Sequence, residues 1–344
     1  MEKILTIIIP TYNMEKYICK CLDSLIISGK NLSLLEVLVI NDGSKDASSV
    51  LAHKYESNYP QIFRVIDKEN GNYGSCVNRG LKEATGKYIK VLDADDSFNT
   101  ESLNQFIDIL QNNDVDLILT DYSLVNEEDN ELCVKKNIIV ANKILSFESI
   151  CNIPAFMKNI AMHAVTYKRQ NLININYHQT EGISYTDEEW IFSPMSTVCR
   201  VFYANINLYK YLVGREGQTM DSKVMVKCIN HVELGIISML KSRQLLPKLS
   251  KQINTYLEFR LLSRMKYVYR KYLLESNDLE LKNLISFDLK IQKVDKYLYD
   301  LGDDIVIHRF IPFKYVKVWR KNRFQEKFWF SSLFSEINNI LRRT

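Results

Sequence analysis

Three carboxylates stand close together at the end of a mostly apolar run. Asp93, Asp95 and Asp96 follow residues 88–92 in the stretch KYIKVLDADDSFNT. Like charges at this spacing repel one another unless something neutralises them. In an extended segment Asp93 and Asp95 point to the same side, and Mg²⁺ binds through one or two carboxylates together with substrate phosphates. The spacing therefore predicts a divalent cation that carries a diphosphate, with a solvated turn as the alternative.

The elements that must position these carboxylates alternate between strands and helices. Over about the first 125 residues, apolar runs of strand length are followed by stretches of helical periodicity. This alternation predicts an α/β fold with a mostly parallel sheet and helices on both of its faces. Ligands of such sheets bind outside the carboxyl ends of the strands.

Two further polar motifs fall at predicted strand ends. PTYN, residues 10–13, follows the first strand, and NDGS, residues 41–44, follows the second. We expect both motifs to share one crevice with the carboxylates, with Asp42 accepting hydrogen bonds from a base or ribose. The backbone from Pro10 to Tyr12 would approach the same nucleoside. Taken alone, NDGS is also an ordinary turn in which Gly43 supplies a positive φ.

The pattern changes to long helical periodicity near residue 220. We therefore expect two domains, an α/β domain over residues 1–220 and a helical C-terminal domain over residues 221–344. The chain has no uncharged apolar stretch of about eighteen residues, and its first residues carry no signal-peptide pattern. These features predict a cytoplasmic protein without a membrane-spanning helix.

Four segments in order resemble the family 2 inverting glycosyltransferases, which have the Rossmann-like GT-A fold. They are TIIIPTYN, LEVLVINDGSKD, the stretch from Asn70 to Asp96, and SYTDEEWIF, and the resemblance covers roughly residues 4–220. Each motif is weak alone, and the order of the four makes the resemblance specific. The resemblance implies that Asp93 lies near the ribose and that Asp95 holds Mg²⁺ or Mn²⁺ against the diphosphate. It also implies a nucleoside pocket lined by Thr11, Tyr12 and Asn13, with Asp42 on the base.

The stretch TDEEWIFSPMSTV predicts a helix that starts at Thr186. Family members usually carry Glu-Asp where this chain has Thr186-Asp187, so Asp187 matches the catalytic base and Glu188 stays open as the alternative. An acidic first turn is also what a helix dipole favours without any catalytic role.

Other positions match the family pattern less well. Of an Ala-Arg-Asn-x-Gly motif the usual arginine is absent and Asn78 matches, and the resemblance implies that Asn78 contacts the nucleotide sugar. Arg215 could meet the diphosphate or lie on the surface. His163 and His178 flank the expected acceptor side, and we assign neither a role. The Gln-x-x-Arg-Trp signature of processive enzymes is absent, which favours a single addition.

The resemblance implies an inverting, metal-dependent transfer of a sugar from a nucleotide-diphosphate sugar, with a UDP-hexose as the favoured donor. The acceptor would be a hydroxyl of a glycan or lipid-linked molecule in bacterial surface-polysaccharide assembly. A sugar-phosphate nucleotidyltransferase would need a glycine-rich basic loop after the first strand, which PTYNMEKY lacks. A non-catalytic nucleotide-sugar-binding partner of another transferase remains the alternative.

The C-terminal residues 309–344 interleave nine basic with nine aromatic residues, against two glutamates. The aromatic side chains either complete the helical core or an interface in a homo-oligomer, or they lie on the inner leaflet of the cell membrane beside anionic lipid. Both interpretations stay open. No recognised nucleic-acid-binding module is present, so we expect no nucleic acid partner.

Overall fold

The chain forms two compact units. The computed structural model describes residues 2–215, 228–275, 279–308, 312–322 and 324. The first unit comprises residues 1–218 and 249–253, and the second comprises residues 219–248 and 254–344. The domain boundary predicted near residue 220 lies among residues 216–227, outside the described residues.

A single mixed sheet forms the centre of the first unit. Its strands are β1 (Leu5–Thr11), β2 (Leu35–Asn41), β3 (Phe63–Asp67), β4 (Tyr88–Val91), β5 (Ser97–Phe98), β6 (Leu117–Val125), β7 (Glu131–Lys135), β8 (Ile144–Ser146), β9 (Val165–Lys168) and β10 (Arg200–Leu212). They lie in the order β3-β2-β1-β4-β9-β6-β10-β5, with β7 beside β6 and β8 beside β10. The strands β1 to β4 are parallel, and so are β6 and β10. Later segments join through antiparallel pairs, as β9 does between β4 and β6.

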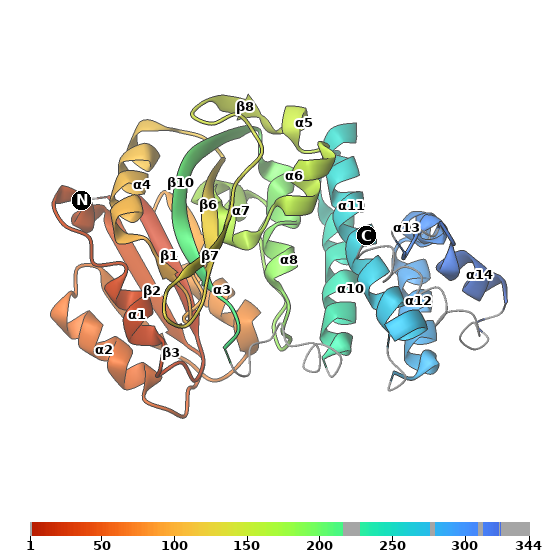
Figure 1. The fold of residues 1–344 in the computed structure, drawn as a ribbon, viewed down its shortest axis with the longest axis horizontal. Coiled ribbons are helices and arrows are strands. Elements are labelled where there is room, and N and C mark those ends of the chain that lie inside the picture. Colours follow the sequence, from red (N-terminus) through yellow and green to blue (C-terminus); the bar gives the residue numbers. More distant parts are fainter. Residues whose placement is uncertain (1, 216–227, 276–278, 309–311, 323, 325–344) are drawn as a thin grey trace. The chain divides into compact units, whose positions relative to one another are not determined.

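Helices cover both faces of this sheet, as the alternating pattern predicts (Figure 1). In the first unit they are α1 (Ile18–Asp23), α2 (Ser48–Asn58), α3 (Asn72–Glu83), α4 (Thr100–Asn112), α5 (Phe147–Ile150), α6 (Pro154–Asn159), α7 (Arg169–Asn174) and α8 (Asp187–Trp190). β1 is buried along its whole length, and its residues Leu5, Ile7 and Ile9 share a core with α1, α2 and α4. Ile8 faces α3, where a Cβ atom on Gly80 would lie 2.4 Å from Ile8 Cγ2. The helix packs closely on the strand because residue 80 has no side chain.

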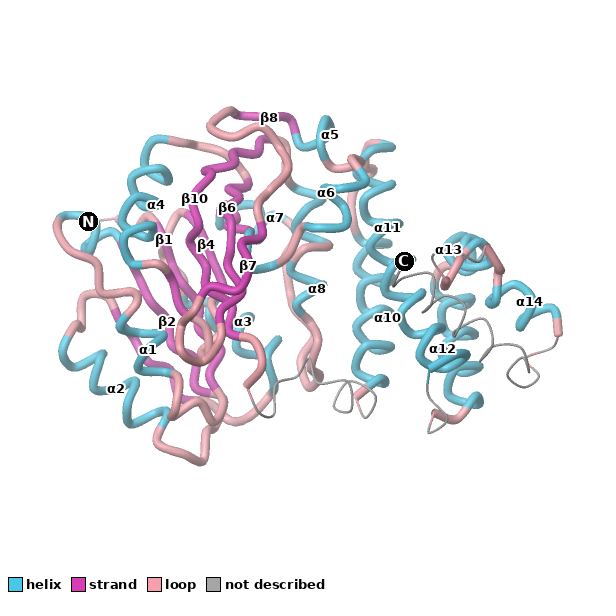
Figure 2. Tube along the Cα trace, viewed as in Figure 1, coloured by secondary structure: helices cyan, strands magenta, loops and turns pink. Residues whose placement is uncertain are grey.

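The central strands lie side by side (Figure 2) and run parallel, so their carboxyl ends meet at one edge of the sheet. Thr11 of β1 pairs with Asn41 of β2, and Asn41 pairs with Asp67 of β3. On the other side, Ile8 of β1 pairs with Val91 of β4. The three polar motifs that follow β1, β2 and β4 therefore emerge at this common edge, as the sequence predicts.

The helix predicted from Thr186 is shorter than expected. The helix α8 ends at Trp190, and a 3-10 turn follows over Ser193–Thr197. Pro194 lies at the start of this turn. Proline has no N–H group and its ring clashes with the carbonyl four residues earlier, so an α-helix cannot continue through it. The expectation of one helix through this stretch was wrong for that reason.

The described part of the second unit is helical. Its α-helices are α10 (Ile229–Leu245), α11 (Lys251–Arg270), α12 (Leu281–Val294), α13 (Lys296–Leu301) and α14 (Tyr315–Lys321). No helix among the described residues is long and apolar enough to cross a membrane. Tyr315 and Trp319 from the aromatic C-terminal stretch are fully buried, so these two side chains belong to the core of the unit. Most of the other aromatic residues of that stretch lie outside the described residues, namely Phe310, Phe328, Trp329, Phe330 and Phe334.

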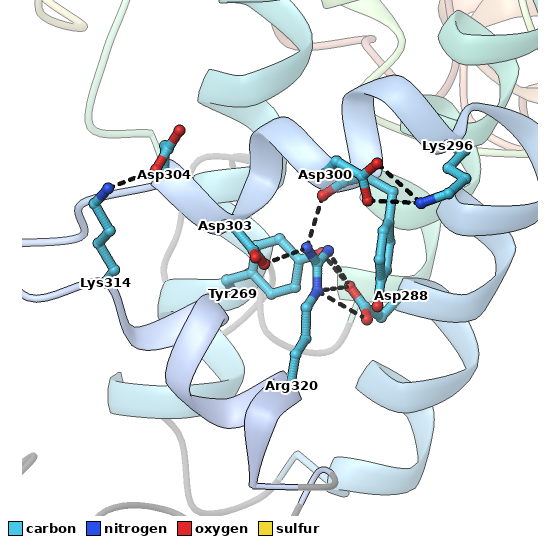
Figure 3. Close-up of polar contacts among 9 residues, drawn as sticks. Tyr269, Asp288, Lys296, Asp300, Asp303, Asp304, Lys314 and Arg320 are labelled. Atoms are coloured by element: carbon cyan, nitrogen blue, oxygen red, sulfur yellow. Dashed lines mark hydrogen bonds and ion pairs between the residues drawn. The ribbon is translucent and has the colours of Figure 1, made fainter.

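Arg320 of α14 ties the helices of the second unit together (Figure 3). Its guanidinium pairs with Asp288 of α12 at 2.6 Å and with Asp303 at 3.0 Å. It also donates to the Tyr269 hydroxyl of α11 at 3.0 Å and to the Tyr299 carbonyl of α13 at 2.7 Å. Asp288 is fully buried, and a buried carboxylate needs a paired cation because its desolvation is costly.

We predict that Arg320→Ala lowers the free energy of unfolding by about 3–5 kcal/mol, because it leaves the buried Asp288 carboxylate without its cation. Lys296→Ala is the matched control, since Lys296 and Asp300 form an exposed pair one turn apart that contributes at most about 1 kcal/mol. Urea unfolding followed by circular dichroism measures both. Equal losses in the two variants would show that the Arg320 contacts contribute no more to the free energy of unfolding than an exposed ion pair does.

Candidate active site

The three carboxylates that follow β4 have different partners. Asp96 is buried, and its Oδ2 accepts from the Tyr209 hydroxyl at 2.6 Å while its Oδ1 accepts from the Leu212 backbone N–H at 2.7 Å. The Tyr209 hydroxyl in turn accepts from the Asp93 backbone N–H at 3.2 Å. Asp96 therefore fastens the acidic turn to β10, a strand more than one hundred residues later.

Asp95 is paired with Arg215, a contact that joins two of the predicted site residues. Arg215 Nε lies 2.6 Å from Asp95 Oδ2, and both side chains are largely buried. The guanidinium also lies over the ring of Tyr17, 5.6 Å from its centroid. The segment after β10 thus returns to the acidic turn and places one cation there.

Asp93 is the least neutralised member of the cluster. Its Oδ1 accepts from the Tyr73 hydroxyl of α3 at 2.7 Å. Burial and the neighbouring Asp95 charge raise the pKa of the Asp93 carboxyl to about 7, and Asp187 adds to that rise. Burial, with Asp95 and Asp93 nearby, also raises the pKa of Asp96 well above its usual range. Full ionisation of the three carboxylates is therefore unfavourable, and a bound cation would stabilise their ionised forms.

His163 completes the cluster, and sequence analysis assigned it no role. One ligand atom each from Asp93, Asp96 and His163 lie within 4.8 Å of one another. The His163 Nδ1 atom is buried without a hydrogen-bond partner. Burial, reinforced by the nearby Lys90, lowers the pKa of the imidazole to about 3, so His163 is neutral at physiological pH. Two carboxylates and a neutral imidazole fit a divalent cation such as Mn²⁺.

Asp187 begins α8 on the same side of the site. Its negative charge contributes to the raised pKa values of Asp93, Tyr73 and Tyr211, so its exposed carboxylate lies close to the acidic cluster. Glu188, the alternative base, is not among the main contributors to these shifts. The next carboxylate in the helix, Glu189, is buried and accepts from the Thr180 backbone N–H at 2.8 Å.

A buried hydrogen-bond system holds the start of α8. The Gln179 side chain is fully buried, and its Nε2 donates to the Thr186 carbonyl at 3.0 Å and to the Thr186 Oγ1 at 2.8 Å. The Asn78 Oδ1 of α3 accepts from the Gln179 backbone N–H at 2.8 Å, and its Nδ2 donates to the Gln179 carbonyl at 2.8 Å. Asn78, predicted to contact the donor, is thus engaged in holding the loop that precedes α8.

The nucleoside side of the edge contains a pocket of about 500 Å³. Tyr12, predicted to line it, is 45% exposed and forms one wall with Lys68 and Asn70. Asp42 is buried behind that wall, where its Oδ1 accepts from Lys68 Nζ at 2.6 Å and from the Gly71 backbone N–H at 2.9 Å. Lys68 was not among the predicted site residues, although it directly follows β3 and so lies at a strand end like the predicted motifs.

Three other residues predicted to contact the nucleoside, Pro10, Thr11 and Asn13, do not line this pocket. Pro10 and Thr11 are buried at the end of β1. The Asn13 Oδ1 accepts from the Lys45 backbone N–H at 2.8 Å, and the Asn13 backbone N–H donates to Ser44 Oγ at 3.0 Å. Asn13 therefore ties the loop after β1 to the loop after β2.

The fold and the site define an α/β protein of the GT-A class, and comparisons with known proteins agree. Residues 6–173 match the family described as Glycosyl transferase family 2. An uncharacterized glycosyltransferase of Mycoplasma pneumoniae, the MG025 homolog, is 45% identical over 95 residues, 27% of this chain and 31% of that protein. The uncharacterized glycosyltransferase YibD of Escherichia coli is 27% identical over 212 residues, 60% of each protein. These matches span about a third to three fifths of the relatives' lengths.

Solved structures share the fold across most of the chain. S. aureus TarS 1–349 in complex with UDP-GlcNAc has a TM-score of 0.64 at 19% identity, covering 86% of this chain and 82% of that chain. The mannosyltransferase PcManGT from Pyrobaculum calidifontis, in complex with GDP-Man and Mn²⁺, has a TM-score of 0.51 at 14% identity, covering 88% and 83%. Residues 6–173, just under half of this chain, therefore match glycosyl transferase family 2, as the motifs predict.

We predict that Asp93→Asn stabilises the protein in the absence of divalent cations. The folded protein holds the Asp93 proton up to pH about 7, above the pKa in the unfolded chain, so this residue's contribution to stability is greatest at low pH and is lost as pH rises toward about 7. The variant should therefore exceed the unsubstituted protein by about 1–3 kcal/mol at about pH 8 and match it below about pH 4.

Urea unfolding in a chelating buffer at both pH values measures this difference. A stability gap that does not change with pH would contradict the raised pKa.

Proposed function

We propose that this protein is a metal-dependent inverting glycosyltransferase. It transfers a sugar, with a UDP-hexose as the favoured donor, to a hydroxyl of a glycan or lipid-linked acceptor in surface-polysaccharide assembly. The observation that carries the proposal is the meeting of Asp93, Asp95 and Asp187 beside the Tyr12 pocket, at the strand ends where an α/β sheet binds ligands. The sugar nucleotides in the TarS complex with UDP-GlcNAc and the PcManGT complex with GDP-Man support the donor class.

The nucleoside would occupy the pocket beside Tyr12. The half-exposed Tyr12 ring offers an apolar face to a base, and the loops after β1 and β2 are fixed to each other through Asn13. Asp42 is held by Lys68 and the Gly71 N–H, so from behind the pocket wall it would act on the nucleoside through Lys68, which lines the pocket. This arrangement suits one flat, polar ring system.

The diphosphate would lie at the acidic turn. Asp95 and Asp93 would supply carboxylate oxygens, and the neutral His163 lies in one cluster with Asp93 and Asp96. Mg²⁺ prefers oxygen ligands, so a histidine nitrogen favours Mn²⁺. A divalent cation bound here would offset the charge that develops on the leaving diphosphate. Arg215, whose guanidinium pairs with Asp95, would donate hydrogen bonds to a phosphate oxygen.

Asp187 would accept the proton of the acceptor hydroxyl as that oxygen attacks the anomeric carbon. Its carboxylate is exposed, as a base that meets an incoming acceptor must be, and it acts electrostatically on Asp93 and Tyr73. One base and no covalent intermediate suffice for inversion. The buried Gln179 that fixes Thr186 would keep this base in place.

We predict that Asp187→Asn lowers the turnover number by about two to four orders of magnitude, the range for loss of a general base. Donor affinity should stay nearly unchanged because the substitution leaves the nucleoside pocket intact. Glu188→Gln is the matched control, since it neutralises the neighbouring carboxylate of the same helix. Turnover is measured by release of the nucleoside diphosphate.

The outcome that assigns the base to Glu188 instead is a large loss in Glu188→Gln with none in Asp187→Asn. Tight UDP binding by the unsubstituted protein, with neither hydrolysis nor transfer for any acceptor, would favour the non-catalytic binding partner.

We further predict that Asp95→Ala abolishes the Mn²⁺-dependent stabilisation of the protein by UDP-sugars while leaving the fold intact. Removing one of several crowded like charges does not destabilise the unliganded cluster, although Arg215 loses its partner. Glu101→Ala, which removes an exposed carboxylate of α4, is the control. Thermal unfolding with a panel of nucleotide sugars, with and without Mn²⁺, provides the measurement, and an unchanged Mn²⁺-dependent shift in Asp95→Ala would contradict the metal assignment.

A further inference from the structure

The second unit carries an open groove between α10 and α12 that the proposed reaction does not use. Its volume is about 890 Å³, within the range of pockets that bind small ligands, about 300–1,000 Å³. The apolar part of its lining comes from Leu234 and Ile237 of α10 and from Val294 and the almost fully buried Phe287 of α12. Leu234 is 47% exposed, so its side chain is accessible to a ligand in the groove.

Three lysines stand along this groove, Lys241 of α10 and Lys290 and Lys293 of α12. All three are exposed, and within the described part of the chain none of them forms an ion pair. By contrast, Lys282 and Lys296, which flank Lys290 and Lys293 in sequence, pair with Glu280 and Asp300. The groove therefore combines uncovered carbon with uncompensated positive charge.

One carboxylate also lines the groove, and it is already engaged. Glu233 of α10 accepts from the Tyr272 hydroxyl at 2.6 Å. Burial raises the pKa of the Glu233 carboxyl, and the Lys290 charge opposes that rise. The charge balance among the lining residues therefore remains positive.

We propose that this groove binds an anionic lipid, with a hydrocarbon chain along Leu234, Ile237 and Phe287 and a phosphate against the lysines. A hydrocarbon chain needs no hydrogen bonds from the apolar floor. An extended peptide would leave backbone N–H and C=O groups unmatched there, which is costly. Lys290 and Lys293 are three residues apart on one helix, so both reach the same phosphate from one face.

This assignment does not depend on the proposed transferase activity. The two are compatible, because a lipid-linked acceptor presents the same combination of hydrocarbon and phosphate. The groove would then hold the anchor of such a molecule, whatever reaction occurs at the acidic turn.

The test is calorimetric titration of the full chain with dodecyl phosphate, kept below its critical micelle concentration. Inorganic phosphate and dodecyl maltoside serve as the comparison ligands, since they supply the anion alone and the chain alone. We expect dodecyl phosphate to bind at least about tenfold more tightly than either, because a charge-assisted hydrogen bond and a buried chain each contribute more than about 1.4 kcal/mol.

The double variant Lys290→Glu/Lys293→Glu should weaken dodecyl phosphate binding by at least about tenfold. The matched control is Lys30→Glu/Lys54→Glu, which makes the same change in net charge at two exposed lysines of the first unit. Leu234→Glu tests the apolar floor and should also weaken binding. Because all of these positions are exposed, circular dichroism should show an unchanged fold.

If dodecyl phosphate binds, either of two results would overturn the proposal. One is equal affinity for dodecyl maltoside or for inorganic phosphate, and the other is equal weakening by the two double variants. Absence of dodecyl phosphate binding, together with self-association that Leu234→Glu abolishes in sedimentation, would assign the groove to a second copy of the chain and would also overturn it.

Discussion

The structure of the first unit depends on keeping three neighbouring carboxylates at one sheet edge. Asp93, Asp95 and Asp96 follow a fully buried strand, where charges cannot be left to water alone. The chain satisfies each of them differently, with a tyrosine hydroxyl on Asp93, a guanidinium on Asp95 and a backbone N–H with a second tyrosine on Asp96. Three of these four partners, Tyr209, Leu212 and Arg215, come from β10 and the residues after it, so the late part of the chain must return to the strand ends.

That return explains features that look irregular in isolation. β10 runs parallel to β6 but shifts register between Tyr203 and Tyr209, and Asn205 adopts a φ of 48° within it. A bulge of this kind re-aims a strand. Beyond the bulge, Tyr209 and Leu212 reach Asp96. The same edge is closed on its other side by the loop before α8, which Asn78 and Gln179 hold against α3.

The sequence predicted the α/β fold and the edge where the motifs meet, because both follow from local periodicity and from where polar residues interrupt it. It did not predict the pairing of Asp95 with Arg215 or the place of His163, because both depend on segments that are distant in the chain and approach only through tertiary packing. The helix expected from Thr186 was too long because the prediction followed the acidic and apolar pattern of the stretch and did not allow for Pro194, which ends an α-helix. Asn78 matched a family motif, yet its contacts lie within the protein. The roles assigned to the individual site residues remain predictions.

The central claim is that the acidic turn holds a cation against a diphosphate. Calorimetric titration of UDP into the protein, with Mn²⁺ and in a chelating buffer, tests it most directly. Repulsion between the carboxylates and the diphosphate should make UDP bind at least about tenfold more weakly without Mn²⁺. Equal UDP affinity in the two buffers would contradict the account.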